Sequence, residues 1–278
     1  MILDDKNVES DTSSTGGNKT ENENQTDIIY IKSVKMFIDS VKNSLDDTLI
    51  CYDWINDDIH IRKFDFSEMT DTFPIPLIVD DNDYHHPVKN KVTSGFGVRR
   101  WQFHYGIDLD LNTGDSVYNT FNGIVRVSTY SKSYGNVVVV RQQNGLESLY
   151  AHLSKRLVAV DSVLKAGDVV GLGGNTGWSF GSHLHYELRF FDEALDPTDI
   201  IDFENYKLYN DTLYLTSCNF AYRELIKDLE RIRFHIVQPG NTLSHIAVWY
   251  GTTVSALCRL NGISPNKILQ IGERIRVR

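Results

Sequence analysis

Short strand-like segments separated by glycine turns fill the chain from residue 92 to residue 201. Two examples are residues 123–127 and 136–141, in which branched residues that favour strands follow or precede glycines that favour turns. The same region has no ten-residue pattern of helical period. The spacing therefore predicts a mainly β domain built of antiparallel strands.

Composition narrows the class of protein. The 278 residues suffice for one to three domains with a sizeable core. An apolar content of 41% and a charged content of 23% are ordinary for a soluble globular protein, and no run of eighteen apolar residues predicts a membrane span. The net charge of −9 argues against electrostatic binding to nucleic acid or to an anionic membrane. Recognition of an acidic polymer would need a shaped site.

The first third of the chain divides into two segments. Residues 1–27 are polar and lack aromatic residues, so we expect a disordered tether. Residues 1–30 show no basic region followed by an apolar one, so no signal peptide is predicted in this chain. Residues 28–91 are expected to form an extension that packs on the β domain, with an amphipathic helix over 28–48 and one or two short strands within 48–66.

Residues 202–233 are predicted to connect the β domain to a further domain. A hairpin is expected around Asn210 and Asp211, followed by a helix from about 220 to 232. Three cysteines, Cys51, Cys218 and Cys258, are far apart and match no zinc-binding pattern. They allow at most one disulfide, and we expect three buried thiols.

Two pairs of residues stand out within the predicted β domain. His104 and Asp108 are four positions apart, and His183 and His185 are two positions apart. Residues at i, i+2 and i+4 face the same side of a strand, so the members of each pair are expected to converge. Two imidazoles and one carboxylate provide the three protein ligands that a catalytic zinc ion uses, with a fourth position open to water. His152 is a fifth candidate residue.

The neighbours of these pairs leave several alternatives open. Asp110 follows Asp108 by two positions and competes with it as a candidate ligand. Glu187 is expected on the same strand face as His185, where it either orients a ligand imidazole or forms an ion pair with Arg189.

Tyr105 and Tyr150 either line a groove or pack within the sheet. Gly106 and Gly181 argue against a helix at either pair, so the ligands are expected on strands and strand ends.

Six segments around these residues are similar to those of a known family. In chain order they are Ser94-Gly95-Phe96-Gly97-Val98-Arg99, the His104/Asp108 pair, Tyr134-Gly135-Asn136, Tyr150-Ala151-His152-Leu153, Gly174-Asn175-Thr176-Gly177 and the His183/His185 pair. Together they resemble the lysostaphin/LytM-type zinc endopeptidases of family M23, which cut peptidoglycan peptides, over about residues 92–197.

The resemblance implies a role for each candidate. Zinc would be bound by His104, Asp108 and His185, while His152 and His183 would be catalytic histidines that do not bind the metal. One of these two would act as general base, and the other would stabilise the oxyanion or protonate the leaving amine. The sequence does not assign the two parts.

The last segment, residues 234–278, has a separate signature. It contains His235-Ile236-Val237-Gln238-Pro239-Gly240-Asn241-Thr242-Leu243, and it closes with Ile271-Gly272-Glu273-Arg274-Ile275-Arg276-Val277. It resembles a LysM module, a small βααβ fold that binds glycans containing N-acetylglucosamine. Asn241 stands where the family usually has Asp, and we expect it to serve equally well as a helix N-cap.

The two resemblances together imply a zinc-dependent peptidoglycan endopeptidase that hydrolyses stem or cross-link peptides and is targeted to glycan by the LysM module. One alternative is a non-catalytic scaffold that activates other cell-wall hydrolases, against which the presence of all five candidate residues argues. Another is a glycan-binding protein with an inert β domain.

Peptidoglycan is the expected partner, with peptide in the groove of the β domain and glycan near Gly240, Asn241 and Thr242. We expect a monomer in the cell envelope or secreted, without a nucleic-acid partner.

Overall fold

The computed structural model describes residues 54–61, 66, 69–99 and 102–278. The tether predicted for residues 1–27 and the helix predicted for 28–48 lie outside these ranges. None of the described helices is long and apolar enough to cross a membrane.

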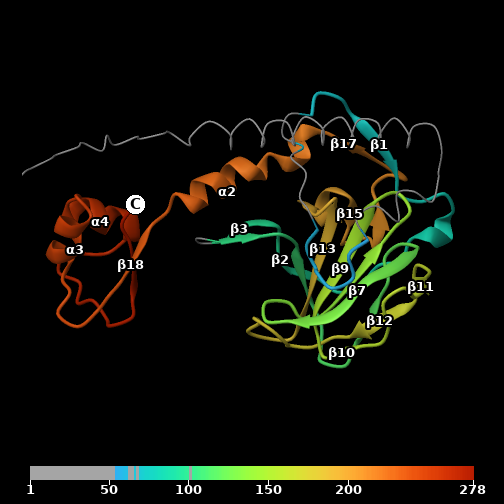
Figure 1. Ribbon diagram of the computed structural model, residues 1–278, viewed down its shortest axis with the longest axis horizontal. Coiled ribbons are helices and arrows are strands. Elements are labelled where there is room, and N and C mark those ends of the chain that lie inside the picture. The colour runs from blue at the N-terminus through green and yellow to red at the C-terminus, as the bar shows by residue number, and fades with distance from the viewer. Residues whose placement is uncertain (1–53, 62–65, 67–68, 100–101) are drawn as a thin grey trace, which may run out of the picture. The chain divides into compact units, whose positions relative to one another are not determined.

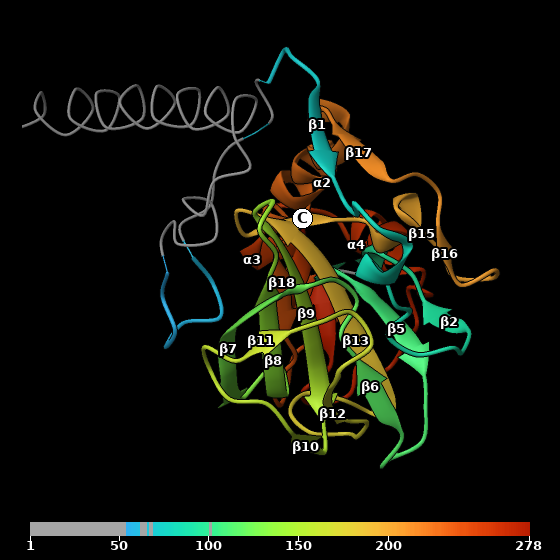
Figure 2. The ribbon, with the colours of Figure 1, turned by 90° about the vertical axis from the view of Figure 1, so that its right-hand side faces the viewer.

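The largest sheet among the described residues has eight antiparallel strands, in the order β11-β7-β8-β9-β13-β5-β2, with β14 paired to β13 (Figures 1 and 2). Its strands are β2 (Val92–Ser94), β5 (Ile107–Asp110), β7 (Gly123–Ser131), β8 (Gly135–Arg141), β9 (Leu146–Leu153), β11 (Val163–Leu164), β13 (His183–Phe190) and β14 (Glu193–Leu195). The prediction of a mainly antiparallel β domain is confirmed.

Smaller sheets surround the large one. Their strands are β6 (Ser116–Tyr118), β10 (Lys155–Arg156) and β12 (Val169–Leu172) in one sheet, and the pairs β1 (Phe73–Pro76) with β17 (Thr212–Leu215), β3 (Gly97–Arg99) with β4 (Gln102–His104), and β15 (Ile201–Asp202) with β16 (Lys207–Leu208). Three single turns of 3-10 helix occur at η1 (Asp81–Asp83), η2 (Pro197–Asp199) and η3 (Ser217–Phe220).

Both faces of the large sheet are covered at its centre. Strand β9 is buried along its whole length, including its polar residues Glu147, Ser148 and His152. On one face, Val139 and Leu149 lie in a buried cluster with Ile59 from the N-terminal segment. On the other face, the Tyr150 hydroxyl accepts a hydrogen bond of 2.7 Å from the Thr120 backbone N–H. Tyr150 is therefore a packing residue.

Residues 54–61 form bends and no strand, contrary to the prediction for this part of 48–66. Their backbone carbonyls are held by a buried guanidinium instead of a neighbouring strand. Arg126 donates to the carbonyl oxygens of Ile55, Asp58 and Ile59 at 2.7–2.8 Å, and it also pairs with the buried Glu147. Arg126 therefore holds the segment on the sheet, together with the buried Ile59 side chain and the contact of His60 with Asp192.

The predicted hairpin around Asn210 and Asp211 is wrong. Strand β16 pairs with β15, whose connecting turn is held by Asp202, because its carboxylate accepts from the backbone of Glu204 and Asn205. Strand β17 pairs with β1, far away in sequence. Asn210 and Asp211 are typical of a tight turn between paired strands, but the strand pair that forms here is β15–β16, which the turn at Asp202 closes.

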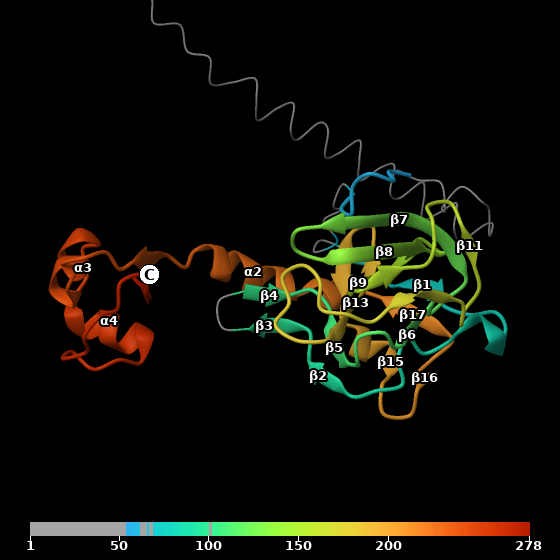
Figure 3. The ribbon, with the colours of Figure 1, turned by 90° about the horizontal axis from the view of Figure 1, so that it is seen from below.

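The helix predicted from about 220 to 232 is confirmed as α2 (Tyr222–Glu230). Its first residue, Tyr222, stacks on Phe103 of β4 with ring centroids 4.9 Å apart, and it contacts Phe96 edge-on at 5.3 Å. Figure 3 shows the β3–β4 hairpin beside this helix. The contact ties the connector to the hairpin that carries His104.

Residues 234–278 form the predicted βααβ unit, with β18 (Phe234–Ile236), α3 (Leu243–Trp249), α4 (Val254–Asn261) and β19 (Arg274–Arg276). Its core is a cluster of its own: Val237, Leu243, Ile246, Ala247, Leu257, Cys258, Ile275 and Val277.

Two details of the sequence prediction need correction. Thr242, not Asn241, is the N-cap of α3, because the Thr242 side chain accepts from His245 N. The side chain of Asn241 instead closes the preceding turn by accepting from Gln238 N at 3.0 Å. Cys258 is buried as expected, but Cys218 is exposed. Cys51 lies outside the described residues.

Candidate metal centre

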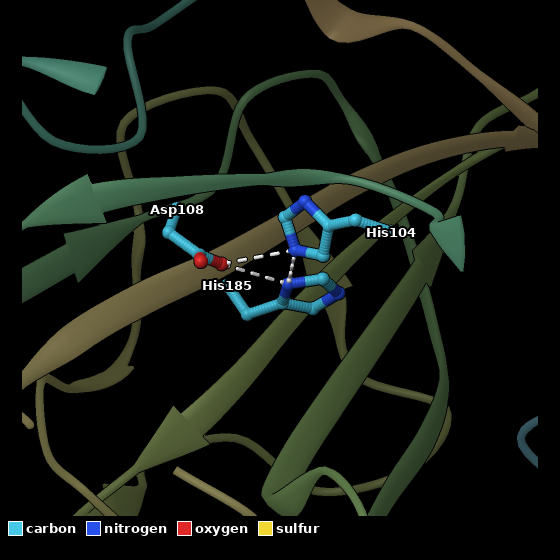
Figure 4. A group of neighbouring side chains, drawn as sticks. All are labelled: His104, Asp108 and His185. Atoms are coloured by element: carbon cyan, nitrogen blue, oxygen red, sulfur yellow. Dashed lines mark hydrogen bonds and ion pairs between the residues drawn. The ribbon is translucent and has the colours of Figure 1, made fainter. Parts of the chain in front are cut away.

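Three side chains converge at strands β5 and β13 within the large sheet (Figure 4). His104 Nε2 lies 2.9 Å from His185 Nδ1, and Asp108 Oδ1 lies 3.1 Å from the former and 3.0 Å from the latter. All three residues are largely buried, and their ligand-type atoms lie within 4.8 Å of one another. The structure therefore brings together His104, Asp108 and His185, as the sequence predicts.

The other polar atom of each side chain is engaged on the outside of the cluster. His104 Nδ1 donates to the Gly95 carbonyl at 2.8 Å, and His185 Nε2 donates to Glu187 Oε1 at 2.7 Å. Asp108 Oδ2 accepts from Arg99 Nη2 at 2.9 Å. In neutral imidazoles these outer bonds use the only N–H, so the inner nitrogens face one another and the carboxylate with lone pairs.

This arrangement of donors fits a metal ion. The carboxylate oxygen and the two inner nitrogens form a compact set of donors, in which a metal ion would replace the proton that His185 Nδ1 carries beside Asp108. Ligand atoms of a tetrahedral zinc site lie about 2.0–2.2 Å from the ion and so roughly 3.3–3.6 Å from one another. The observed separations of 2.9–3.1 Å need a spread of only a few tenths of an ångström.

The route by which His104 and Asp108 meet differs from the expected one. They belong to two strands, β4 and β5, and not to one face of a single strand. The chain turns between them at Gly106, where a Cβ atom would lie 2.3 Å from the Tyr186 carbonyl oxygen of β13. Only glycine allows this approach, and it brings β5 into register with β13 so that Asp108 is opposite His185.

Two further histidines lie beside the cluster. His152 and His183 have ring centroids 4.8 Å apart, and His183 Nε2 lies 3.6 Å from Asp108 Oδ1. His152 Nδ1 faces the Thr176 carbonyl at 2.8 Å, and His183 Nδ1 faces the Gly181 carbonyl at 2.8 Å. A carbonyl only accepts, so both rings carry their proton on Nδ1 when neutral and leave Nε2 as an acceptor.

His152 is held in an unusual backbone conformation. Its φ of 61° lies in the left-handed region, which residues other than glycine seldom adopt. Its backbone is fixed by a bond from His152 N to the Tyr134 carbonyl. Burial lowers the pKa of the His152 imidazole to about 4, so the ring is neutral at pH 7.

A buried chain of charged residues contacts His185 at Nε2, the ring nitrogen that does not face His104 and Asp108. Glu187 bonds His185 through one carboxylate oxygen and accepts from Arg189 Nε through the other, at 2.6 Å. Arg189 continues to Asp192 at 2.8 Å, and Asp192 contacts His60 Nδ1 at 3.1 Å. Both roles considered for Glu187 are therefore present at once.

These contacts explain the protonation of the cluster. Burial raises the pKa of Asp108, but hydrogen bonds with His104 and His185 outweigh it and hold the pKa far below its usual range. Burial lowers the pKa of His185, but its bonds to Asp108 and Glu187 outweigh burial and raise the pKa to about 9. A metal ion that binds at His185 Nδ1 would therefore displace a proton.

Other candidates lie elsewhere. Asp110 is exposed and outside the cluster, although its backbone is opposite His183 in the sheet. Tyr105 is partly buried and packs on Phe103, with ring centroids 5.1 Å apart. Sequence analysis missed Arg99 as a site residue, although it quoted the segment that ends with it. His60 was also not predicted as a site residue, because nothing in the sequence connects it with Asp192.

The expected glycan-contacting residues lie in the loop between β18 and α3. Gly240 has a φ of 80°, and the side chains of Asn241 and Thr242 are used within the loop, as described above. A cluster of exposed rings lies nearby, where His235 is 5.5 Å from Trp249 and 5.7 Å from Tyr250.

Comparison with known proteins agrees with this geometry. The family described as Peptidase family M23 matches residues 102–197, and the LysM domain matches residues 235–278. The DD-carboxypeptidase/endopeptidase Mpg of Neisseria meningitidis serogroup B is 37% identical over 119 residues, which cover 41% of this chain and 27% of that protein. The murein hydrolase activator NlpD of Salmonella dublin is 30% identical over 112 residues, which cover 40% of this chain and 29% of that protein.

Among solved structures, the catalytic domain of lysostaphin from Staphylococcus simulans is 30% identical, with a TM-score of 0.38; the match covers 40% of this chain and 90% of that domain. The chain matches only about a quarter of the length of the two curated relatives. Residues 102–197 of this chain therefore form a domain of peptidase family M23, and residues 235–278 form a LysM domain.

Proposed function

We propose that this protein is a zinc-dependent endopeptidase that hydrolyses the stem or cross-link peptides of peptidoglycan. The observation that carries the proposal is the convergence of His104 Nε2, Asp108 Oδ1 and His185 Nδ1 beside two histidines that face the same cluster. The similarity to a relative named as a DD-carboxypeptidase/endopeptidase supports the choice of substrate.

In this proposal His104, Asp108 and His185 hold the zinc ion. When bound, zinc would polarise the scissile carbonyl as a Lewis acid and lower the pKa of a bound water. The hydrogen bonds from His104 to Gly95 and from His185 to Glu187 orient two of the ligands. Arg99 Nη2 lies 3.0 Å from His104 Nε2 and would have to move away when that nitrogen binds the metal.

His152 is proposed as the general base. Its ring is neutral at pH 7, and its Nδ1 is occupied by the Thr176 carbonyl, so Nε2 accepts the proton of the attacking water. His183, whose Nε2 lies 3.6 Å from Asp108 Oδ1, is proposed to stabilise the oxyanion or to protonate the leaving amine. The neutral ring of His152 supports this proposed division of roles.

The LysM domain is proposed to bind glycan that contains N-acetylglucosamine and to keep the peptidase near its peptides. Binding through a second domain raises the effective concentration of substrate without a new contact at the metal site. Both activities place the working protein outside the cytoplasmic membrane, in the envelope or secreted. Peptidoglycan would be its only macromolecular partner, and the protein would act as a monomer.

A second candidate function is activation of other cell-wall hydrolases by a chain that cuts nothing itself. The similarity to a relative named as a murein hydrolase activator supports it. The complete set of donors and the two adjacent histidines favour catalysis, because a scaffold has no need of them.

Digestion of purified cross-linked peptidoglycan distinguishes the two. The zinc-loaded protein is incubated alone with the polymer, and the released fragments are identified by mass spectrometry. Endopeptidase activity predicts fewer cross-linked fragments and new peptide termini. If the polymer stays intact while the protein accelerates a separate amidase, the activator function is correct and the endopeptidase proposal is wrong.

A further inference from the structure

Two large aromatic side chains are exposed in the loop that joins β12 to β13, residues 173–182. Trp178 is 64% exposed and Phe180 is 96% exposed. Single exposed apolar residues are common on protein surfaces, but two aromatic rings within three residues are an unusual concentration. Their importance depends on how close their loop lies to the proposed catalytic residues.

The same loop contacts both histidines that lie beside the metal cluster. The Thr176 carbonyl accepts from His152 Nδ1, and Ser179 Oγ lies 3.3 Å from His183 Nδ1. Trp178 and Phe180 directly flank Ser179 in the chain. The two exposed rings are therefore carried by the loop that contacts both proposed catalytic histidines, on either side of the residue that contacts His183.

The base of this loop is fixed. Trp178 N donates to the Ser133 carbonyl at 2.9 Å, and Thr176 Oγ1 donates to the Leu153 carbonyl at 2.7 Å. At Gly177 a Cβ atom would lie 2.2 Å from Gly135 N, so the loop and the β7–β8 turn are in close contact. Rings carried on a fixed loop lose little freedom when they bind a ligand, which favours binding.

The chemistry of the loop indicates the ligand. Residues 173–182 contain no charged side chain, although the whole chain has a net charge of −9. The polar groups between and around the aromatic rings are hydroxyls and an amide, from Asn175, Ser179 and Ser182. Flat apolar rings together with neutral hydrogen-bonding groups suit a sugar ring, which has an apolar C–H face and a rim of hydroxyls. The loop offers no charged side chain to pair with an anionic partner.

We propose that Trp178 and Phe180 are substrate-binding residues that stack on a sugar ring attached to the peptide being cut. The inference rests on the proposed endopeptidase function and makes it more specific: the preferred substrate is a peptide that still carries its glycan. The side chains of the peptide alone do not require two flat aromatic surfaces.

The test compares two soluble substrates in the full-length, zinc-loaded protein. One is a cross-linked muropeptide dimer with its disaccharides, and the other is the same cross-linked peptide after removal of the sugars. Stacking of a flat ring on an aromatic side chain changes affinity by about tenfold or more in nucleic-acid complexes. We expect Trp178→Ala and Phe180→Ala each to lower kcat/KM about tenfold on the sugar-bearing dimer, through KM, and less than twofold on the sugar-free peptide.

Three further variants make the result specific. Trp178→Tyr should retain most of the sugar preference because it keeps a flat ring, whereas Trp178→Leu should lose it although it stays apolar. Tyr214→Ala removes an equally exposed aromatic ring from β17 and should change neither substrate. Equal losses on both substrates in Trp178→Ala and Phe180→Ala, or no loss on either, would overturn the proposal.

Direct binding separates this inference from the proposed function. The indole N–H resonance of Trp178, assigned by its loss in Trp178→Tyr, is followed by NMR while the disaccharide of N-acetylglucosamine and N-acetylmuramic acid is added. A saturating shift without hydrolysis of either dimer would support the sugar contact and contradict the endopeptidase function. Hydrolysis of both dimers with no shift and no sugar preference would contradict the sugar contact alone.

Discussion

His185 Nε2 donates a 2.7 Å hydrogen bond to Glu187 Oε1, two residues along the same strand. The bond leaves His185 Nδ1 facing His104 and Asp108. The orientation of the ligand ring is therefore set by a carboxylate that is itself held by Arg189. The geometry of the candidate metal centre therefore depends on this buried pair as well as on the three converging residues.

The first prediction concerns this carboxylate. Glu187→Gln keeps the size of the side chain but removes its charge, so the His185 ring is held less firmly and is less basic. We expect zinc affinity to fall by about 10–100-fold. The measurement is competition for zinc with a chelator of known affinity at fixed pH.

Glu147→Gln is the matched control. Glu147 is equally buried and pairs with Arg126 and Arg141 on the same sheet, away from the ligands. Its loss should reduce stability and leave zinc affinity unchanged. Equal zinc affinity in Glu187→Gln and wild type would mean that the 2.7 Å bond does not support the ligand.

The second prediction separates the two histidines beside the cluster from the ligands. His152→Ala and His183→Ala should each lose about 10²–10⁴-fold in kcat, which is typical for removal of a general acid or base. Both should keep one zinc per chain. His245→Ala, which alters an exposed ring of α3, serves as the control and should cut a soluble peptide at the wild-type rate. If His152→Ala or His183→Ala turned over substrate at the wild-type rate, that histidine would have a packing role and no catalytic one.

The third prediction concerns stability at mildly acidic pH. His86 is buried against Phe203, and burial lowers the pKa of its imidazole from 6.5 to about 4. Between these two values the unfolded chain binds a proton that the folded protein does not. The free energy of unfolding therefore falls as the pH drops from about 6.5 to 4, by at most about 3 kcal/mol from this residue.

His86→Phe removes the imidazole that binds this proton in the unfolded chain. The variant should lose about 1 kcal/mol at pH 7, because the Tyr84 hydroxyl loses its 2.8 Å partner. Its deficit relative to wild type should shrink or reverse by pH 4.5. The measurement is urea unfolding of both proteins across this range, and a deficit that does not change with pH would contradict the assignment to His86.

The fourth prediction concerns the LysM domain. All residues of its buried cluster lie between 237 and 277. Removal of the residues after Arg233 therefore removes this cluster whole and leaves none of its side chains in the shortened protein. We expect the shortened protein to bind insoluble peptidoglycan less tightly and to hydrolyse a short soluble peptide at the rate of the full chain. If the shortened protein folds and binds zinc but no longer cuts the soluble peptide, the domain contributes to the active site.

Much of the site was predictable because its residues lie in local patterns. His183 and His185 alternate along one strand, and glycines mark the turns on either side of the metal ligands. The path between His104 and Asp108 was not predictable from spacing, because it depends on how closely Gly106 approaches the Tyr186 carbonyl of another strand.

The predictions that were wrong failed mainly because they depended on contacts between segments far apart in the sequence. His60 joins the buried network through Asp192, 132 residues away, and Arg126 holds the carbonyls of residues 55, 58 and 59. The strand β17 pairs with β1 in place of its sequence neighbour. In each case a tertiary contact outweighs a local preference that the sequence shows correctly.

The most direct test of the account measures zinc content and peptide hydrolysis in the same samples. Metal-free protein is titrated with zinc, and the rate of hydrolysis of a cross-linked peptide is recorded after each addition. The rate should rise linearly and stop rising at one equivalent, and His185→Ala should bind no tight zinc and cut no peptide. Wild-type hydrolysis by the metal-free protein, or one tightly bound zinc in His185→Ala, would contradict the proposed roles of His104, Asp108 and His185.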